Sequence, residues 1–140
     1  MPVLQWAILC SRAITDQETN TISYIDAIEG ISVSGFPFPF PPVCVSTLWR
    51  RQSERDTLSV RIRIQDPSGQ TIQSFEPDSP ISMDKKRHRL NVILGGAQIK
   101  GPGEYLIVIE QRAGESAETW KQEQVLPIDV SPFAPAKAVQ

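Results

Sequence analysis

The fold is decided by the stretch Leu58-Ser59-Val60-Arg61-Ile62-Arg63-Ile64-Gln65, in which apolar and polar side chains alternate strictly. Successive side chains of a β-strand point to opposite faces of its sheet, so this period of two predicts a strand with one buried face and one solvated face. The next residues, Asp66-Pro67-Ser68-Gly69, match a β-turn with proline in its second position and glycine in its fourth. A strand followed by a tight turn is typical of an antiparallel sheet.

Seven further stretches have the composition of strands, and no stretch shows the period of an amphipathic helix. The eight predicted strands cover residues 3–13, 21–31, 43–51, 58–65, 71–75, 87–94, 104–112 and 118–130. Turn residues separate them, which predicts an all-β, single-domain antiparallel β-sandwich with Greek-key, immunoglobulin-like connections. A small closed barrel is the alternative. The sandwich domain is expected to span residues 1–130, followed by a C-terminal tail at 131–140.

The first two predicted strands are joined by the polar residues 16–20, so an antiparallel hairpin is expected. In each strand, apolar residues of one parity form a set. The sets are Leu4, Trp6, Ile8 and Cys10 in the first strand, and Ile22, Tyr24 and Ile28 in the second. If both sets share the buried face, the numbers of two paired residues must add up to an even number.

The composition is that of an ordinary globular protein and indicates no charged partner. The 140 residues are 40% hydrophobic and 21% charged, with a formal net charge of −2. Such a small charge attracts neither nucleic acid nor an anionic membrane. The sequence shows no basic leader and no run of about 20 apolar residues, so a cytoplasmic protein without a membrane partner is expected. Cys10 and Cys44 are then expected to stay reduced and buried.

Residues with catalytic potential are few and form no recognisable pattern. The only histidine, His88, is expected at the edge of the core, since no nucleophilic pair or zinc-ligand spacing surrounds it. The glycine-rich residues 95–103 lie between strands and lack the helix that a phosphate loop requires. We therefore expect no enzyme, no cofactor and no metal site.

Asp26 is the exception among the acidic residues, because it shares the parity of the apolar residues in its strand. A buried acid with a raised pKa can act as a general base, so an enzyme with an unrecognised site is one alternative. The other interpretations are an ion pair with Arg12, a hydrogen bond to a tyrosine hydroxyl, or a bulge that turns the side chain to solvent.

Two surfaces are candidates for binding a partner. Phe36, Phe38 and Phe40 alternate with prolines, and such a segment either folds back over the core or presents an apolar ridge. We expect at least one ring to anchor on the core and at least one to stay exposed as a contact residue, because proline keeps the backbone extended.

The second candidate surface is basic. Nine of the fourteen Lys and Arg residues lie within 50–63 and 85–89. If the strands at 58–65 and 87–94 share a sheet, one solvated face would carry Arg61, Arg63, Arg87 and Arg89. Such a face would bind nucleic acid or another polyanion, unless neighbouring acidic residues balance its charge.

Several motifs resemble a family of small bacterial proteins known as a domain of unknown function. The resemblance is carried by Ile8-Leu9-Cys10-Ser11-Arg12, residues 15–25 and 66–69, Gly103-Glu104-Tyr105 and Trp120. It implies a bacterial cytosolic β-sandwich and brings no catalytic residues. Residues 101–105 also resemble the corner of immunoglobulin-like sandwiches at which a tyrosine hydroxyl bonds the preceding backbone.

These observations predict a non-enzymatic protein-interaction or assembly module. Its expected partner is another protein or a second copy of the chain. Binding of a polyanion or nucleic acid through the basic face is the alternative, together with the unrecognised active site.

Overall fold

The computed structural model describes residues 1–113 and 119–133, and every regular element in these ranges is a strand. The longer strands are β1 (Val3–Thr15), β2 (Ile22–Ala27), β3 (Gly30–Val33), β5 (Val43–Arg50), β6 (Thr57–Gln65), β7 (Thr71–Phe75), β9 (Arg87–Leu94), β11 (Gly103–Arg112) and β12 (Lys121–Pro132). The two-residue strands are β4 (Phe38–Pro39), β8 (Ile81–Ser82) and β10 (Gln98–Ile99). The all-β class is confirmed, but the predicted count of about eight strands is wrong, because the structure has twelve.

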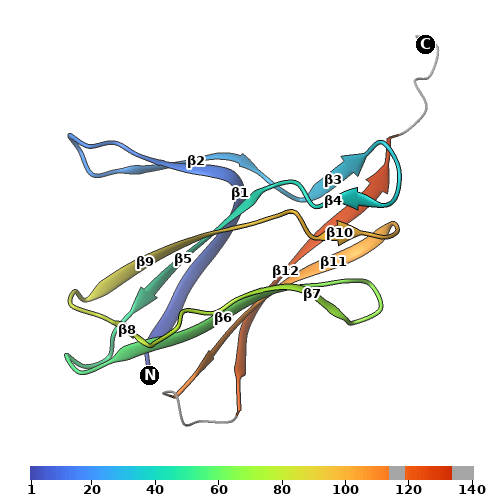
Figure 1. The fold of residues 1–140 in the computed structure, drawn as a ribbon. Helices are drawn as coiled ribbons and strands as arrows, with labels where there is room; N and C mark the ends of the chain where they lie inside the picture. The colour runs from blue at the N-terminus through green and yellow to red at the C-terminus, as the bar shows by residue number, and fades with distance from the viewer. Residues whose placement is uncertain (114–118, 134–140) are drawn as a thin grey trace.

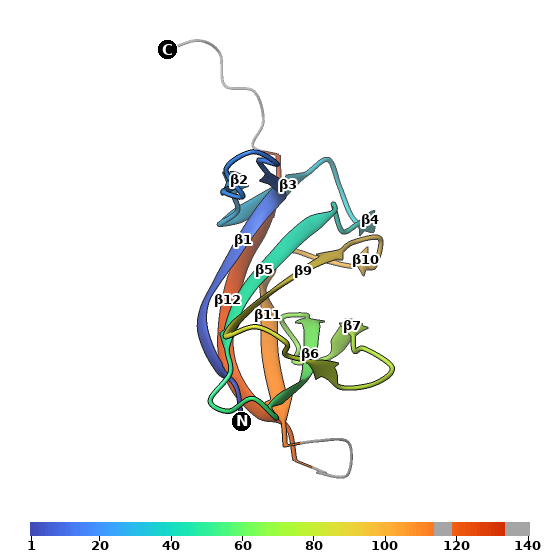
Figure 2. The same ribbon diagram turned by 90° about the vertical axis from the view of Figure 1, so that its left-hand side faces the viewer.

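Most strands belong to two larger sheets (Figure 1). One has four strands in the order β2-β1-β5-β9, and the other has the order β3-β12-β11-β6-β7, with β8 beside β6. The strands β4 and β10 form a separate pair. In the turned view of Figure 2, β1, β5 and β9 lie in front of β11 and β12. In the described ranges no helix is long and apolar enough to cross a membrane.

The prediction of a wholly antiparallel arrangement is wrong for one pair, since β3 and β12 run parallel. The predicted strand at 21–31 is divided in the structure between β2 and β3, which belong to different sheets. Asp26, next to the end of β2, has a positive φ of 54°, which lies outside the extended conformation of a strand. The chain therefore leaves β1 after Ala27 and continues into the other sheet.

The predicted parity of the first hairpin is also wrong. Cys10 pairs with Ala27, and Ala13 with Tyr24, so the numbers of paired residues add up to an odd number. The predicted set of β1 is also divided, because the pairing of β1 with β5 has a register shift between Leu4 and Trp6. Leu4 therefore lies on the core face, whereas Trp6, Ile8 and Cys10 lie on the other face of the sheet.

One hydrophobic core takes side chains from both larger sheets. The alternation predicted for residues 58–65 is confirmed, because four side chains of β6 are at most 1% exposed, namely Leu58, Val60, Ile62 and Ile64. Trp49 of β5 is completely buried against them in the same core. Tyr105 of β11 donates its hydroxyl to the carbonyl of Gly101 at 2.8 Å, which confirms the hydrogen bond that the corner resemblance implied.

Cys10 and Cys44 lie opposite each other on β1 and β5, and both are buried and free. Burial, with the neighbouring Cys44, raises the pKa of the Cys10 thiol to about 11, so little thiolate exists at neutral pH. The last strand, β12, continues beside β3 to Pro132, two residues beyond the 130 predicted for its end. Residues 134–140 of the predicted tail lie outside the described ranges, as does residue 118 at the predicted start of the last strand.

Candidate functional site

The three phenylalanines of the Phe-Pro segment fold back over the core. Phe40 is 1% exposed, and its ring meets that of Tyr105 edge to face with 6.1 Å between centroids. Phe36 and Phe38 are half-buried and pack against the same core. The expected anchor is therefore confirmed in Phe40, and the expected exposed ring is wrong. Pairing of β4 with β10 holds the segment against the core, so it covers the core instead of forming a ridge.

The four arginines of the predicted basic face lie in different sheets. Arg61 and Arg63 belong to β6 of the larger sheet, whereas Arg87 and Arg89 belong to β9 of the four-stranded sheet. The premise that these strands share a sheet is therefore wrong. Strand alternation determines which way a side chain points, but not which sheet its strand joins.

Arg61 and Arg63 share one carboxylate within their own sheet. Their Nε atoms donate to the same oxygen of Glu110, over 3.0 Å and 2.9 Å. Glu110 is only 6% exposed. Burial alone would raise the pKa of this carboxyl, but the hydrogen bonds from both arginines outweigh burial and hold the pKa below its usual value. This part of the predicted face is a half-buried ion cluster, in which one carboxylate balances one of the two arginine charges.

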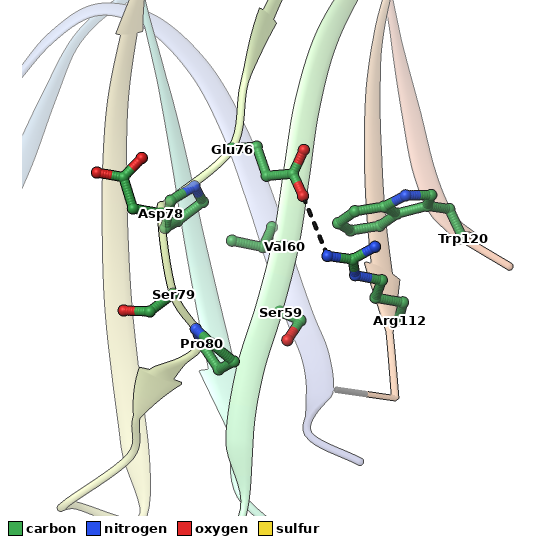
Figure 3. A pocket seen from close by; sticks show the side chains of 9 residues that line it. Ser59, Val60, Glu76, Asp78, Ser79, Pro80, Arg112 and Trp120 are labelled. Carbon is green, nitrogen blue, oxygen red and sulfur yellow. Dashed lines mark hydrogen bonds and ion pairs between the residues drawn. The ribbon is translucent and has the colours of Figure 1, made fainter. Parts of the chain in front are cut away.

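A pocket of about 200 Å³ lies beside this cluster (Figure 3). Trp120 forms one side, and Pro77 and Pro80 belong to its lining. The guanidinium of Arg112 lies 4.5 Å from the centre of the Trp120 ring, and its Nη2 is 3.4 Å from a carboxylate oxygen of Glu76. Cofactor and ligand pockets usually measure about 300–1,000 Å³, so this one suits a single side chain of a partner better than a small molecule.

Ser59 contributes a polar group to the lining of this pocket. It is 8% exposed, and its hydroxyl finds no hydrogen-bond partner in the described part of the chain. A buried hydroxyl without a partner costs free energy, which makes it a candidate to bond a guest side chain.

The other candidate surface is the free side of β9, the last strand of the four-stranded sheet. Two sets of hydrogen bonds show which backbone groups face that side. At one end, Arg51 donates its N–H to the carbonyl of Lys86 at 2.9 Å, on the side of β5. At the other end, both backbone groups of Gly95 bond the side-chain amide of Gln73 on β7, each at 3.1 Å.

Both ends imply the same alternation along β9. In an antiparallel pair, residues whose backbone groups face the partner alternate with residues whose groups face away. His88, Leu90 and Val92 therefore direct N–H and C=O toward β5. The residues between them direct these groups to the free side, and we call them the β9 edge residues: Arg87, Arg89, Asn91 and Ile93.

The β9 edge residues also carry the exposed side chains of the strand. Ile93 is the most conspicuous, with 72% of its surface exposed. Asn91 accepts a hydrogen bond from the buried Ser46 hydroxyl at 2.5 Å, and Arg87 donates to Gln5 at 3.2 Å. His88 is half-buried beside them, which confirms its predicted place at the edge of the core.

A hollow of about 420 Å³ lies at the N-terminal end of β9. It is lined by Asn20, Ser82, Asp84, Lys85, Arg87, His88 and Arg89. Three permanent cations face one carboxylate there, so this end of the sheet is positive. Of the four arginines predicted to form a basic face, Arg87 and Arg89 on β9 therefore do lie on a positive surface, and the arginines of β6 are not part of it.

The remaining predicted chemical groups are not brought together. Asp26 is exposed, as in the alternative that turned it to solvent, but β1 and β2 pair without a register shift across it, so its positive φ and not a bulge accompanies the exposure. Tyr24 lies with its hydroxyl 3.2 Å from that of Ser46 instead. Within residues 1–113 and 119–133, no group of three or more His, Cys, Asp or Glu residues has the arrangement of a metal site.

A family described as "Family of unknown function (DUF6941)" matches residues 5–119. The chain belongs to the DUF6941 family. No curated protein matches the sequence. The predicted resemblance to a domain of unknown function is confirmed, and the DUF6941 match includes β9, Gln73 and the basic hollow.

Sequence reasoning missed two residues of this surface, Gln73 and Ile93. A glutamine within a strand gives no signal of its own, and its contact with Gly95 depends on the approach of two sheets. Ile93 did give a signal, since it has the outward parity of Arg87, Arg89 and Asn91 and is apolar.

Proposed function

We propose that this DUF6941 protein is a non-enzymatic protein-interaction or assembly module of a bacterial cytosolic system. The observation that supports it is the free side of β9, where the β9 edge residues combine outward backbone groups with exposed side chains. Such an edge is a template for another chain unless a proline, a bulge or a covering element blocks it. β9 contains no proline, and its pairing with β5 shows no register shift.

We also propose that the two larger sheets stack as an immunoglobulin-like β-sandwich. The single core shared by both sheets and the hydrogen bond from Tyr105 to Gly101 support this arrangement. A sandwich leaves its edge strands accessible, whereas a closed barrel would pair them.

Site-specific photo-cross-linking in the native host tests the function. A photoreactive amino acid replaces Ile93 in one variant and the exposed Ser74 of β7 in a matched control. We expect one discrete adduct at position 93 and none at 74. The captured protein, once purified, should bind the wild type and lose affinity for the Ile93→Lys variant. Absence of an adduct at position 93, or the same adduct at both positions, would contradict the proposal.

Polyanion binding is the second candidate function, and the basic hollow at the N-terminal end of β9 favours it. A protein that binds through released counterions loses affinity steeply as salt rises. Heparin retention should then fall with salt and drop further in a Lys85→Glu variant. Retention that does not change with this variant would remove the candidate.

A further inference from the structure

The β9 edge residues unite outward backbone groups, exposed side chains and an excess of positive charge. We infer that they bind an extended acidic segment of a partner protein, which joins the four-stranded sheet as an additional antiparallel strand. The inference rests on the proposed function, because it names the chemistry of the partner at the same surface.

The backbone of β9 supplies the pairing groups. Each edge residue offers one N–H and one C=O on the free side, and the alternation is unbroken from Arg87 to Ile93. An added strand would engage all of these groups in one register. Antiparallel pairing is expected, since it is slightly more stable per residue than parallel pairing and occurs throughout this sheet.

Gln73 shows where the added strand must end. Its side-chain amide donates to the carbonyl of Gly95 and accepts from its N–H, which is the pair of bonds that a neighbouring strand would offer. The amide thus occupies the next outward position of the edge after Ile93. A bound segment is limited to the stretch Arg87–Ile93.

The charges of the edge indicate the composition of the segment. Arg87 and Arg89 are exposed, and the exposed Lys85 and Lys86 precede them. Directly opposed residues of two strands lie about 4.5–5.5 Å apart, so carboxylates opposite the two arginines would form cross-strand ion pairs. Ile93 at the other end favours an apolar residue opposite it. A second copy of this chain, paired antiparallel over the same stretch, would place Arg87 opposite Ile93 and Arg89 opposite Asn91, and would offer neither arginine a carboxylate.

The probe for this inference is the synthetic peptide acetyl-Val-Ser-Thr-Ser-Glu-Ser-Glu-amide, with binding to the full chain measured by fluorescence anisotropy. In the antiparallel register its valine faces Ile93 and its glutamates face Arg89 and Arg87. We expect binding that weakens at least about tenfold when lysines replace the glutamates or when the sequence is reversed. Equal binding of the original and the reversed peptide would overturn the inference, because charge alone would then suffice.

Backbone pairing has its own control. In the bound register the N–H groups of the threonine and of the first glutamate point at β9, and those of the serines point away. N-methylation of the first pair should weaken binding at least about tenfold, whereas N-methylation of two serines should change it less than about threefold. Equal effects of the two modifications would refute strand addition.

Charge variants of the protein complete the test. Arg89→Glu should weaken peptide binding at least about tenfold, and the peptide with lysines in place of glutamates should then bind this variant better than the original peptide does. Lys100→Glu changes the net charge equally at an exposed residue after β10, and it should leave binding within about twofold. An equal loss in both variants would contradict a site at β9.

The two proposals fail differently. If the cross-link at position 93 forms but the peptide does not bind, the partner uses side chains instead of the strand edge. The inference is then wrong and the proposed function stands. If neither a cross-link nor peptide binding is found, both are wrong.

Discussion

Proline substitution at two adjacent positions of β9 tests the direction of its backbone groups. Val92 directs its N–H toward β5, where it pairs with Val45, whereas Ile93 directs its N–H to the free side. Proline removes the N–H of the residue that it replaces. It also favours an extended conformation in the preceding residue, which a strand already has. The two substitutions therefore differ mainly in the hydrogen bond that they remove.

The expected magnitudes follow from the structure. Val92→Pro leaves the buried carbonyl of Val45 without its partner, which costs about 1–3 kcal/mol, and the ring adds steric strain against β5. Val92 is 5% exposed, so the substitution also removes apolar burial. Val92→Ala measures that part separately. At Ile93, which is 72% exposed, the difference between the proline and alanine variants should stay within about 0.5 kcal/mol.

Urea unfolding followed by tryptophan fluorescence gives the four free energies, provided that all variants keep the wild-type m-value. We expect the proline-minus-alanine difference in unfolding free energy at Val92 to exceed that at Ile93 by at least about 1 kcal/mol. Equal differences, or a larger one at Ile93, would show that the assigned alternation is wrong. The backbone N–H and C=O groups of the β9 edge residues would then face β5, and they could not bind an added strand.

The other predictions concern the core and the ion cluster. Ile62→Ala should lower the free energy of unfolding by about 2–5 kcal/mol. Arg61→Ala should lower it by clearly less, since Glu110 keeps its bond to Arg63. Equal urea midpoints would contradict the assignment of Ile62 to the buried face of β6 and Arg61 to the solvated face. Phe40→Ala should cost about 3–5 kcal/mol and Phe36→Ala less, in the same urea assay, because only the first ring is fully buried. The pKa of Glu110 is lowered by folding, so its contribution to stability is present above its unfolded pKa of about 4.3 and is lost as pH falls through the folded value. The stability difference between wild type and Glu110→Gln should therefore be constant from neutral pH down to about pH 5 and shrink in more acidic solution; a difference that grows on acidification would contradict the ion cluster.

Local sequence patterns predicted the strands well where one face is buried and the other solvated. β7 and β9 begin and end where alternation and turn residues place them, and β6 differs from its predicted bounds by one residue. These patterns depend on side chains within one strand. The two-residue strands β4, β8 and β10 have no such pattern, since they exist only through their partners.

The errors arise where the backbone departs from regular alternation or where two sheets meet. The turn of the first hairpin places Thr15 opposite Ile22, which gives the odd sum, and the register shift after Leu4 divides the apolar set of β1 between two faces. No residue type announces either feature in the sequence. The split of the basic face has a different origin. Arg61 and Arg87 have the outward parity that was predicted, but the assignment of their strands to sheets is a property of the whole chain.

Amide hydrogen exchange along β9, resolved by NMR, tests the central claim most directly. In the free protein, the account predicts slow exchange at His88, Leu90 and Val92 and fast exchange at the β9 edge residues, because only the first group bonds β5. In the complex with the captured partner, the edge residues should become protected as well. Uniform protection of β9 in the free protein, or edge amides that still exchange fast in the complex, would contradict a partner that docks on this edge.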